Sequence, residues 1–156
     1  MADLAGKKLV ILGLARQGKA LARFAAESGA KVTVSDMRTM EQLRPSIQEL
    51  NGLGINYVFG EHPMSLLKGT DILAISGGVP ADLPLVQAAR VQGIIISNDS
   101  QEFIQRSPAT CIGITGSAGK TTTTALTGAM GKAANRETWI GGNIGRPLIA
   151  ELDNIK

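Results

Sequence analysis

The residues whose types and spacing best suit a chemical function form one glycine-rich run, Thr115-Gly116-Ser117-Ala118-Gly119-Lys120-Thr121. Glycines let a loop curl so that several backbone N–H groups point at one anion, and a helix starting at its end adds a positive pole. In such a loop Lys120 would reach the β- and γ-phosphates, and the Thr121 hydroxyl would bind Mg²⁺. We therefore predict a phosphate-binding loop (P-loop) for ATP or GTP, in which Lys120 and Thr121 are the catalytic residues and Thr121 is the metal ligand. The predicted nucleotide contacts are Gly116, Ser117, Ala118, Gly119, Lys120, Thr121 and Thr122.

The loop is a variant of the usual motif. The strict pattern has glycine six residues before the lysine, and that position is Ile114 here. Thr121 to Thr124 place four β-branched residues in the first helical turn, where each is a weak helix former. Hydroxyl groups directed at phosphate and metal would explain this choice. The alternative is a glycine-rich turn between a strand and a helix in which Lys-Thr occurs by accident.

A second glycine-rich loop, residues 13–18, also follows an apolar run and opens a helix. It is similar to the dinucleotide-binding fingerprint, and Asp36 ends the next strand where an acid would bind a ribose. Ala15 replaces the middle glycine, which normally lets the backbone approach a pyrophosphate. If the chain were a dehydrogenase, Arg38 could bind the 2′-phosphate of NADP. This loop therefore leaves two interpretations open. One is an NAD(P)-binding module or dehydrogenase, and the other is a tight turn beside a surface Asp36.

Short apolar runs, each ended by glycine or a polar residue, predict buried parallel strands that alternate with helices. The predicted strands are Lys8–Leu12, Lys31–Ser35, Tyr57–Phe59, Asp71–Ile75 and Ile94–Ser97. Helical spacing predicts a first helix that contains Leu21, Phe24, Ala25 and Ser28, and further helices at Met40–Leu50 and at Leu85–Val91. This order predicts a Rossmann-like domain, and the carboxyl ends of its strands, including Ser76-Gly77-Gly78, should meet at one crevice.

A second unit is expected from residue 99 onward. We predict a short helix at Ser100–Gln105, a strand at Thr110–Ile114 that carries a buried, reduced Cys111, and a helix after Lys120 with one apolar face. A strand at Thr138–Ile140 and a helix from Leu148 would follow. The predicted domains are therefore 1–98, which is Rossmann-like, and 99–156, which begins a P-loop ATPase α/β domain.

Composition limits the class of protein. The net charge is +3, but the sixteen Lys and Arg residues are scattered and only 3% of residues are aromatic, which argues against a nucleic-acid partner. No apolar run approaches the roughly 20 residues that cross a bilayer, and the first residues do not form a signal peptide. One cysteine and one histidine argue against a disulfide or a zinc site. We expect a cytoplasmic protein.

The two loops together with the segment Gly141-Gly142-Asn143-Ile144-Gly145 resemble the Mur ligase family. The resemblance spans the whole chain and is closest to the branch of the family that adds D-glutamate. Its most specific parts are Gly113 to Thr121 and the segment 141–145. Family members have asparagine where this chain has Ala118, so this chain lacks one polar side chain in the loop.

This resemblance implies that the first domain binds the UDP part of a substrate instead of NAD. The residues implied to bind it are Leu14, Ala15, Arg16, Asp36, Met37, Arg38, Ser76, Gly77, Gly78 and Asn143. It also implies ATP and Mg²⁺ as cofactors, and UDP-N-acetylmuramoyl-L-alanine and D-glutamate as substrates in peptidoglycan synthesis. The reaction would form an amide through an acyl phosphate, and the full-length enzyme would be a monomer.

A complete P-loop domain needs a carboxylate on a neighbouring strand to hold Mg²⁺. The acids after Lys120 are Glu137, Glu151 and Asp153, and none of them follows an apolar run. We therefore expect these 156 residues to be an N-terminal fragment that is inactive alone. The alternatives left open are another Mur ligase, an NAD(P)-binding module, and a binding protein that kept the fold without the chemistry.

Overall fold

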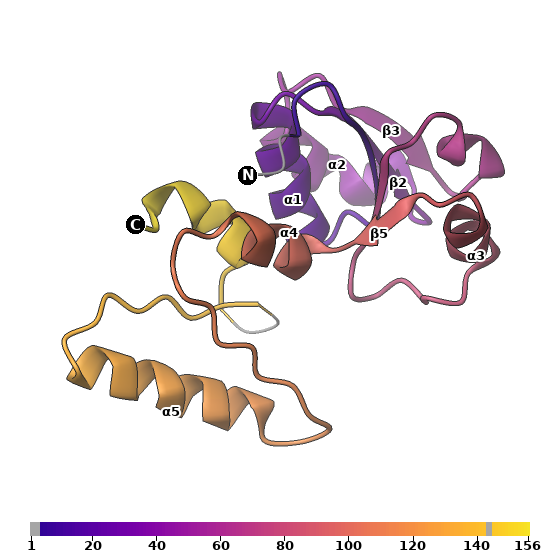
Figure 1. The fold of residues 1–156 in the computed structure, drawn as a ribbon. Coiled ribbons are helices and arrows are strands. Elements are labelled where there is room, and N and C mark those ends of the chain that lie inside the picture. The colour runs from indigo at the N-terminus through magenta and orange to yellow at the C-terminus, as the bar shows by residue number, and fades with distance from the viewer. Residues whose placement is uncertain (1–3, 143–144) are drawn as a thin grey trace.

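The computed structural model describes residues 4–142 and 145–156, and a parallel sheet lies at its centre (Figure 1). The strand order is β3-β2-β1-β4-β5, and every neighbouring pair is parallel. The strands are β1 (Lys8–Leu12), β2 (Lys31–Asp36), β3 (Asn56–Phe59), β4 (Ile72–Ile75) and β5 (Ile95–Ser97). The five strands predicted within residues 1–98 are confirmed, with ends that differ by no more than one residue.

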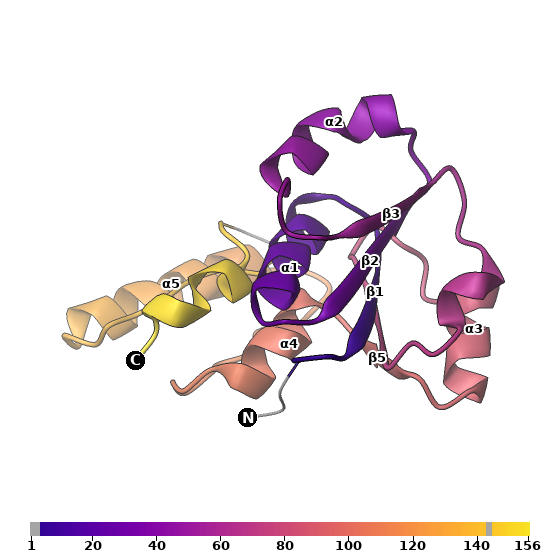
Figure 2. The same ribbon diagram turned by 90° about the horizontal axis from the view of Figure 1, so that it is seen from above.

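Helices cover both faces of this sheet (Figure 2). The helices of the chain are α1 (Arg16–Glu27), α2 (Met40–Glu49), α3 (Pro84–Val91), α4 (Asp99–Arg106) and α5 (Lys120–Ala133), with 3₁₀ helices η1 (Met64–Leu67) and η2 (Leu148–Asn154). In Figure 2, α1 and α4 lie on one side of the sheet and α3 lies on the other. The helices predicted before residue 107 are confirmed, and so is the helix that follows the P-loop.

The alternation of side chains along β1 divides the core into two clusters. Leu9 and Ile11 pack with buried residues of α1, whereas Val10 and Leu12 pack with buried residues of α3. All four side chains are nearly inaccessible to solvent. Successive residues of a strand point to opposite faces, so a strand covered on both faces must be apolar throughout. This requirement explains why the sequence shows continuous apolar runs instead of alternation.

Helix α4 joins the same core although it lies beyond residue 98. Phe103 belongs to the cluster on the α1 side, together with Ile149 of η2. In the same helix, Glu102 accepts a hydrogen bond from the Ser97 hydroxyl and pairs with Arg106, whose Nη1 lies 2.6 Å from Glu102 Oε2. Glu102 and Arg106 are both buried. Removing one partner of a buried ion pair is strongly destabilising, because the other charge is then left unpaired. The hydrogen bond from Ser97 to Glu102 connects β5 to α4.

The segments on either side of α5 differ from the prediction. Residues 110–114 and 138–140 form no strand, so both predicted strands are wrong in this structure. Cys111 is exposed instead of buried, because its segment pairs with no sheet. Gly141 and Arg146 form only an isolated parallel bridge. The helix predicted from Leu148 is present but has 3₁₀ geometry.

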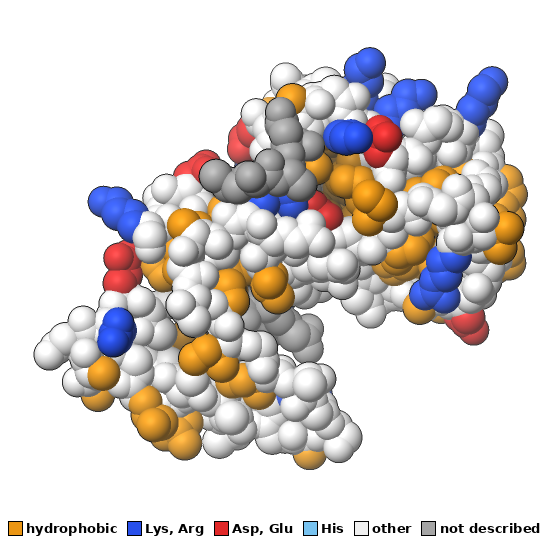
Figure 3. Space-filling model, viewed as in Figure 1, with side chains coloured by type: hydrophobic (Ala, Val, Ile, Leu, Met, Phe, Trp, Pro, Cys, Tyr) orange, Lys and Arg blue, Asp and Glu red, His pale blue; other side chains and the backbone are white. Residues whose placement is uncertain are grey.

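Helix α5 lies apart from the sheet, and hydrophobic side chains are visible on the surface of the part that contains it (Figures 1 and 3). Leu126 and Met130, both expected on its apolar face, are 60% and 64% exposed. Within residues 4–142 and 145–156, no helix is both long and apolar enough to cross a membrane. The predicted boundary at residue 98 stays a prediction, since α4 and η2 pack on α1 while α5 does not.

Candidate functional site

The loop after β1 is held by hydrogen bonds with β2 and with the residue that follows β4. The Gly13 amide donates to the Ser35 carbonyl (2.8 Å), and the Leu14 amide donates to Asp36 Oδ2 (2.6 Å). From the other side, the Ser76 hydroxyl donates to the Gly13 carbonyl (3.0 Å). The carboxyl ends of β1, β2 and β4 are thereby connected, and this edge is where open α/β sheets bind ligands.

Gly18 explains how closely α1 approaches this loop. A Cβ atom at this position would lie 1.9 Å from the Gly13 carbonyl oxygen and 2.6 Å from Ser76 Oγ. No side chain fits in that space, so only glycine allows the first turn of α1 to pack against the loop. The amino end of the twelve-residue α1 therefore stands directly at the edge of the sheet, where its dipole favours an anion.

Asp36 is the most strongly bonded acid at this edge. Besides the Leu14 amide, it accepts hydrogen bonds from the Arg38 amide (2.9 Å) and from Arg38 Nε (3.0 Å) and Nη2 (2.8 Å). Burial alone would raise the pKa of Asp36, but the hydrogen bonds from Arg38 and Leu14 lower that pKa from 3.8 to about 2. The carboxylate is therefore ionised at any physiological pH and fixes the position of the Arg38 guanidinium.

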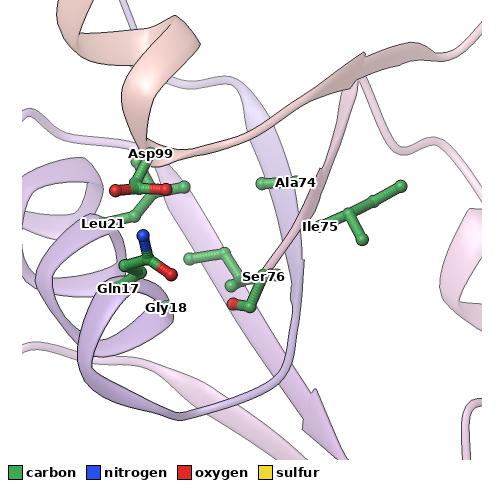
Figure 4. A pocket seen from close by; sticks show the side chains of 8 residues that line it. Gln17, Gly18, Leu21, Ala74, Ile75, Ser76 and Asp99 are labelled. Atoms are coloured by element: carbon green, nitrogen blue, oxygen red, sulfur yellow. The ribbon is translucent and has the colours of Figure 1, made fainter. Parts of the chain in front are cut away.

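A small hollow lies beside the loop, between α1, the end of β4 and the start of α4 (Figure 4). Gln17, Ser76 and Asp99 supply its polar groups. Asp99 is buried, and burial raises its pKa, opposed by the amides of Ser100 and Asp99 and by the charge of Arg16. Sequence reasoning missed Gln17 and Asp99. The signal for Asp99 was available, because it follows the end of β5 as Asp36 ends β2.

The structure brings most of the residues predicted to bind UDP to one edge of the sheet. Leu14, Asp36 and Ser76 are buried there and form the contacts described above. The others at this edge are solvent-accessible, and they are Ala15, Arg16, Met37, Arg38, Gly77 and Gly78. Asn143 lies outside the described residues. The roles of all these residues in binding remain predictions.

The P-loop is folded locally and lies apart from the sheet (Figure 1). Gly119 adopts the left-handed conformation, with φ of +77°, and Lys120 begins α5 directly after it. Lys120 Nζ donates to the Gly116 carbonyl (2.5 Å), so the ammonium lies over its own loop. The predicted nucleotide contacts from Gly116 to Thr122 are exposed. A glycine turn, a helix start and a lysine therefore lie together, as expected for a P-loop, and the role of this loop in nucleotide binding remains a prediction.

The same region offers little to a metal ion. In the part of the chain that the structure describes, no three His, Cys, Asp or Glu side chains gather closely enough to hold one. The predicted metal ligand beside the loop, the Thr121 hydroxyl, is a neutral oxygen. Mg²⁺ prefers octahedral oxygen ligands, including one or two carboxylates and substrate phosphates. The loop therefore suits the phosphates better than the metal.

Comparison with known proteins agrees with this geometry. A model for the family described as "Mur ligase MurD-like, N-terminal domain" matches residues 7–98. The UDP-N-acetylmuramoylalanine–D-glutamate ligase of Geobacter metallireducens is 41% identical over 147 residues, which cover 94% of this chain and 32% of that protein. The ligase of the same name from Koribacter versatilis is 42% identical over 154 residues, covering 97% of this chain and 34% of its own.

Solved structures give the same assignment of fold. A pseudomurein peptide ligase type C from Methanothermus fervidus aligns with a TM-score of 0.58 and 28% identity over 94% of this chain and 31% of that one. A murein peptide ligase from Psychrobacter arcticus aligns with a TM-score of 0.55 and 21% identity, over 83% of this chain and 27% of that one. This chain spans about a third of the length of the curated relatives it matches.

The family model covers the whole parallel sheet, including the loop after β1, Asp36 and Ser76, and more than half of the chain. The chain therefore belongs to the Mur ligase family, with an N-terminal domain of the MurD-like type.

Proposed function

We propose that this chain binds the UDP part of UDP-N-acetylmuramoyl-L-alanine and supplies the P-loop of an ATP-dependent ligase that adds D-glutamate. The observation that carries the proposal is the identity of 41–45% to D-glutamate ligases over 94% of the chain, which includes both glycine loops. An enzyme of this kind would act in the cytoplasm, where ATP is available, and would contribute to peptidoglycan synthesis.

The edge of the sheet is suited to a nucleoside diphosphate. The amino end of α1, with Ala15 and Arg16 exposed beside it, would hold the pyrophosphate. Asp36 and Arg38, locked together by three hydrogen bonds, would hold the uridine. Because Asp36 is already ionised and bonded, the site requires little reorganisation when a ligand binds, which favours affinity. Gly78 leaves open space beyond the end of β4.

The P-loop would serve the first chemical step. The γ-phosphoryl group of ATP would pass to the carboxylate of the L-alanine residue, giving an acyl phosphate and ADP. The amine of D-glutamate would then attack the acyl carbon, lose a proton and expel phosphate, leaving an amide. Lys120 would neutralise charge on the transferring group, and Thr121 would contribute one oxygen to Mg²⁺. Positioning and charge neutralisation supply most of the catalysis in such transfers.

Calorimetry with the purified chain tests the substrate half of the proposal. UDP-N-acetylmuramoyl-L-alanine should bind, and Asp36→Asn should weaken binding at least about tenfold, because it removes the charge that orients Arg38. Asp71→Asn is the matched control, since Asp71 precedes β4 at the opposite edge, where it accepts from the Lys8 amide (2.8 Å). Binding of NADH in preference to the UDP compound would overturn the proposal and favour a dinucleotide-binding module.

The ATP half has its own test. ATP should bind to the chain, and Lys120→Ala should weaken that binding, because the lysine is the one cation placed by the loop itself. Lys132→Ala, in the last turn of α5, removes the same charge from the far end of the helix and should have no effect. Equal loss in both variants would mean that general charge, and not the loop, attracts the nucleotide.

A further inference from the structure

The only histidine of the chain, His62, lies just beyond β3 and contacts a buried hydroxyl. Ser35, on the neighbouring β2, is fully buried. Its hydroxyl lies 2.8 Å from the Glu61 carbonyl oxygen and 2.7 Å from His62 Nδ1. Neither contact has a role in the site described above, so the hydrogen bonds around this hydroxyl can be counted separately.

The hydrogen bonds of the Ser35 hydroxyl determine which ring nitrogen of His62 carries the proton. A carbonyl oxygen can only accept, so the single hydrogen of the Ser35 hydroxyl goes to Glu61. The short contact with Nδ1 then requires that Nδ1 donate to the Ser35 oxygen. In a neutral imidazole with the proton on Nδ1, Nε2 is an acceptor. Burial lowers the pKa of His62, and the charge of Asp36 opposes this only in part, so the ring is neutral at pH 7.

The pairing of β3 with β2 places His62 near Asp36, at the predicted nucleoside site. Strand β3 pairs with β2 so that Phe59 stands opposite Asp36, and the Gly60 amide donates to the Asp36 carbonyl (2.9 Å). His62 therefore follows directly after the residues bonded to Asp36. Within the described residues, His62 Nε2 has no hydrogen-bond partner in the protein. Met37, next to Asp36 in the chain, is 61% exposed and offers an apolar, polarisable surface for a flat ring.

We infer that His62 reads the base of the bound nucleotide, with Nε2 accepting a hydrogen bond from the N3–H imide of uracil. The inference rests on the proposed function, which requires a uridine nucleotide at this edge. Uracil presents a donor at N3, whereas cytosine presents an acceptor at the same place. A neutral His62 held by Ser35 in the Nδ1-protonated form therefore accepts uracil and opposes cytosine. Ser35 is a positioning residue that selects the tautomer.

Because the chain has one histidine, its ring nitrogens can be observed without ambiguity in a long-range ¹H–¹⁵N correlation spectrum. In the free protein at pH 7, Nδ1 should appear protonated and Nε2 unprotonated. Addition of UDP should shift the Nε2 resonance in the direction of an accepted hydrogen bond, while CDP should not. A spectrum with the proton on Nε2, or an Nε2 resonance that ignores UDP, would overturn the inference.

Affinities provide the second readout. We expect wild-type protein to prefer UDP over CDP by about tenfold or more, since the wrong base leaves two acceptors facing each other. His62→Asn keeps a donor near the position of Nδ1 for Ser35 but removes the Nε2 acceptor, and the preference should fall below about threefold. UDP methylated at N3 should bind the wild type no better than CDP. If the ribose hydroxyls were the real donors, the variant would lose UDP and CDP equally, which would overturn the base assignment.

A titration sharpens the same test. As the pH falls through the pKa of His62, Nε2 gains a proton and becomes a donor, so the UDP preference should shrink in the wild type and stay flat in His62→Asn. Asp36, whose charge acts on the ring, stays ionised throughout because its pKa is about 2. Failure of the wild type to bind any uridine nucleotide would overturn the proposed function together with this inference. Normal UDP binding with an unchanged preference in the variant would overturn the role of His62 alone.

Discussion

The two glycine loops share the same local sequence pattern but lie in different structural environments. Each follows an apolar run and opens a helix, α1 in one case and α5 in the other. The loop at residues 13–18 is bonded to Ser35, Asp36 and Ser76, and a Cβ at Gly18 would collide with its backbone. The loop at 115–121 is exposed and bonded to itself through Lys120. A loop motif therefore determines the local path of the backbone, whereas contacts with the sheet hold the loop in place.

Gly18→Ala should give the largest effect on stability. The added Cβ would lie 1.9 Å from a backbone oxygen that cannot move without disturbing β1, so we expect a loss of about 3 kcal/mol or more in the free energy of unfolding. Gly78→Ala is the control, because a Cβ there meets nothing within 4 Å. Urea denaturation measures both variants. A Gly18→Ala protein as stable as the control would mean that α1 does not pack as closely as described.

Leucines on the two helices that follow the loops make a matched pair. Leu21 of α1 is 1% exposed, and Leu21→Ala should cost about 3 kcal/mol through lost burial and the cavity left behind. Leu126 of α5 is 60% exposed, and the same truncation should change stability by no more than about 0.5 kcal/mol. Thermal unfolding in parallel compares them. Similar losses would show that α5 is covered in solution, which would erase the contrast between the two loops.

Asp36 gives the smallest effect, and it depends on pH. The folded state lowers its pKa from 3.8 to about 2, so its stabilisation is complete above pH 3.8 and is lost as the pH falls through about 2. The contribution at neutral pH should be about 1–2 kcal/mol, reduced by the partial exposure of Arg38. Acid unfolding of wild type and Asp36→Asn should therefore converge between these two pH values. Curves that run parallel down to pH 2 would contradict the assigned hydrogen bonds.

Much of the first domain was predictable from sequence because its signals are local. The apolar runs placed β1 to β5 within one residue, and the rule that parallel strands bind ligands at their carboxyl ends brought Leu14, Asp36 and Ser76 to one edge. Two features needed the fold. These are the ring nitrogen of His62 that carries the proton and the hydrogen bonds of Arg38 to Asp36.

The second region shows where local signals fail. The sequence by itself determined α5, since each hydrogen bond of a helix is made within a few residues and survives even where Leu126 and Met130 are exposed. It could not determine strands at 110–114 or 138–140, because a strand satisfies its backbone only by pairing with another strand. Apolar pattern thus decides which segments can become strands, and only the tertiary structure decides which of them find a partner.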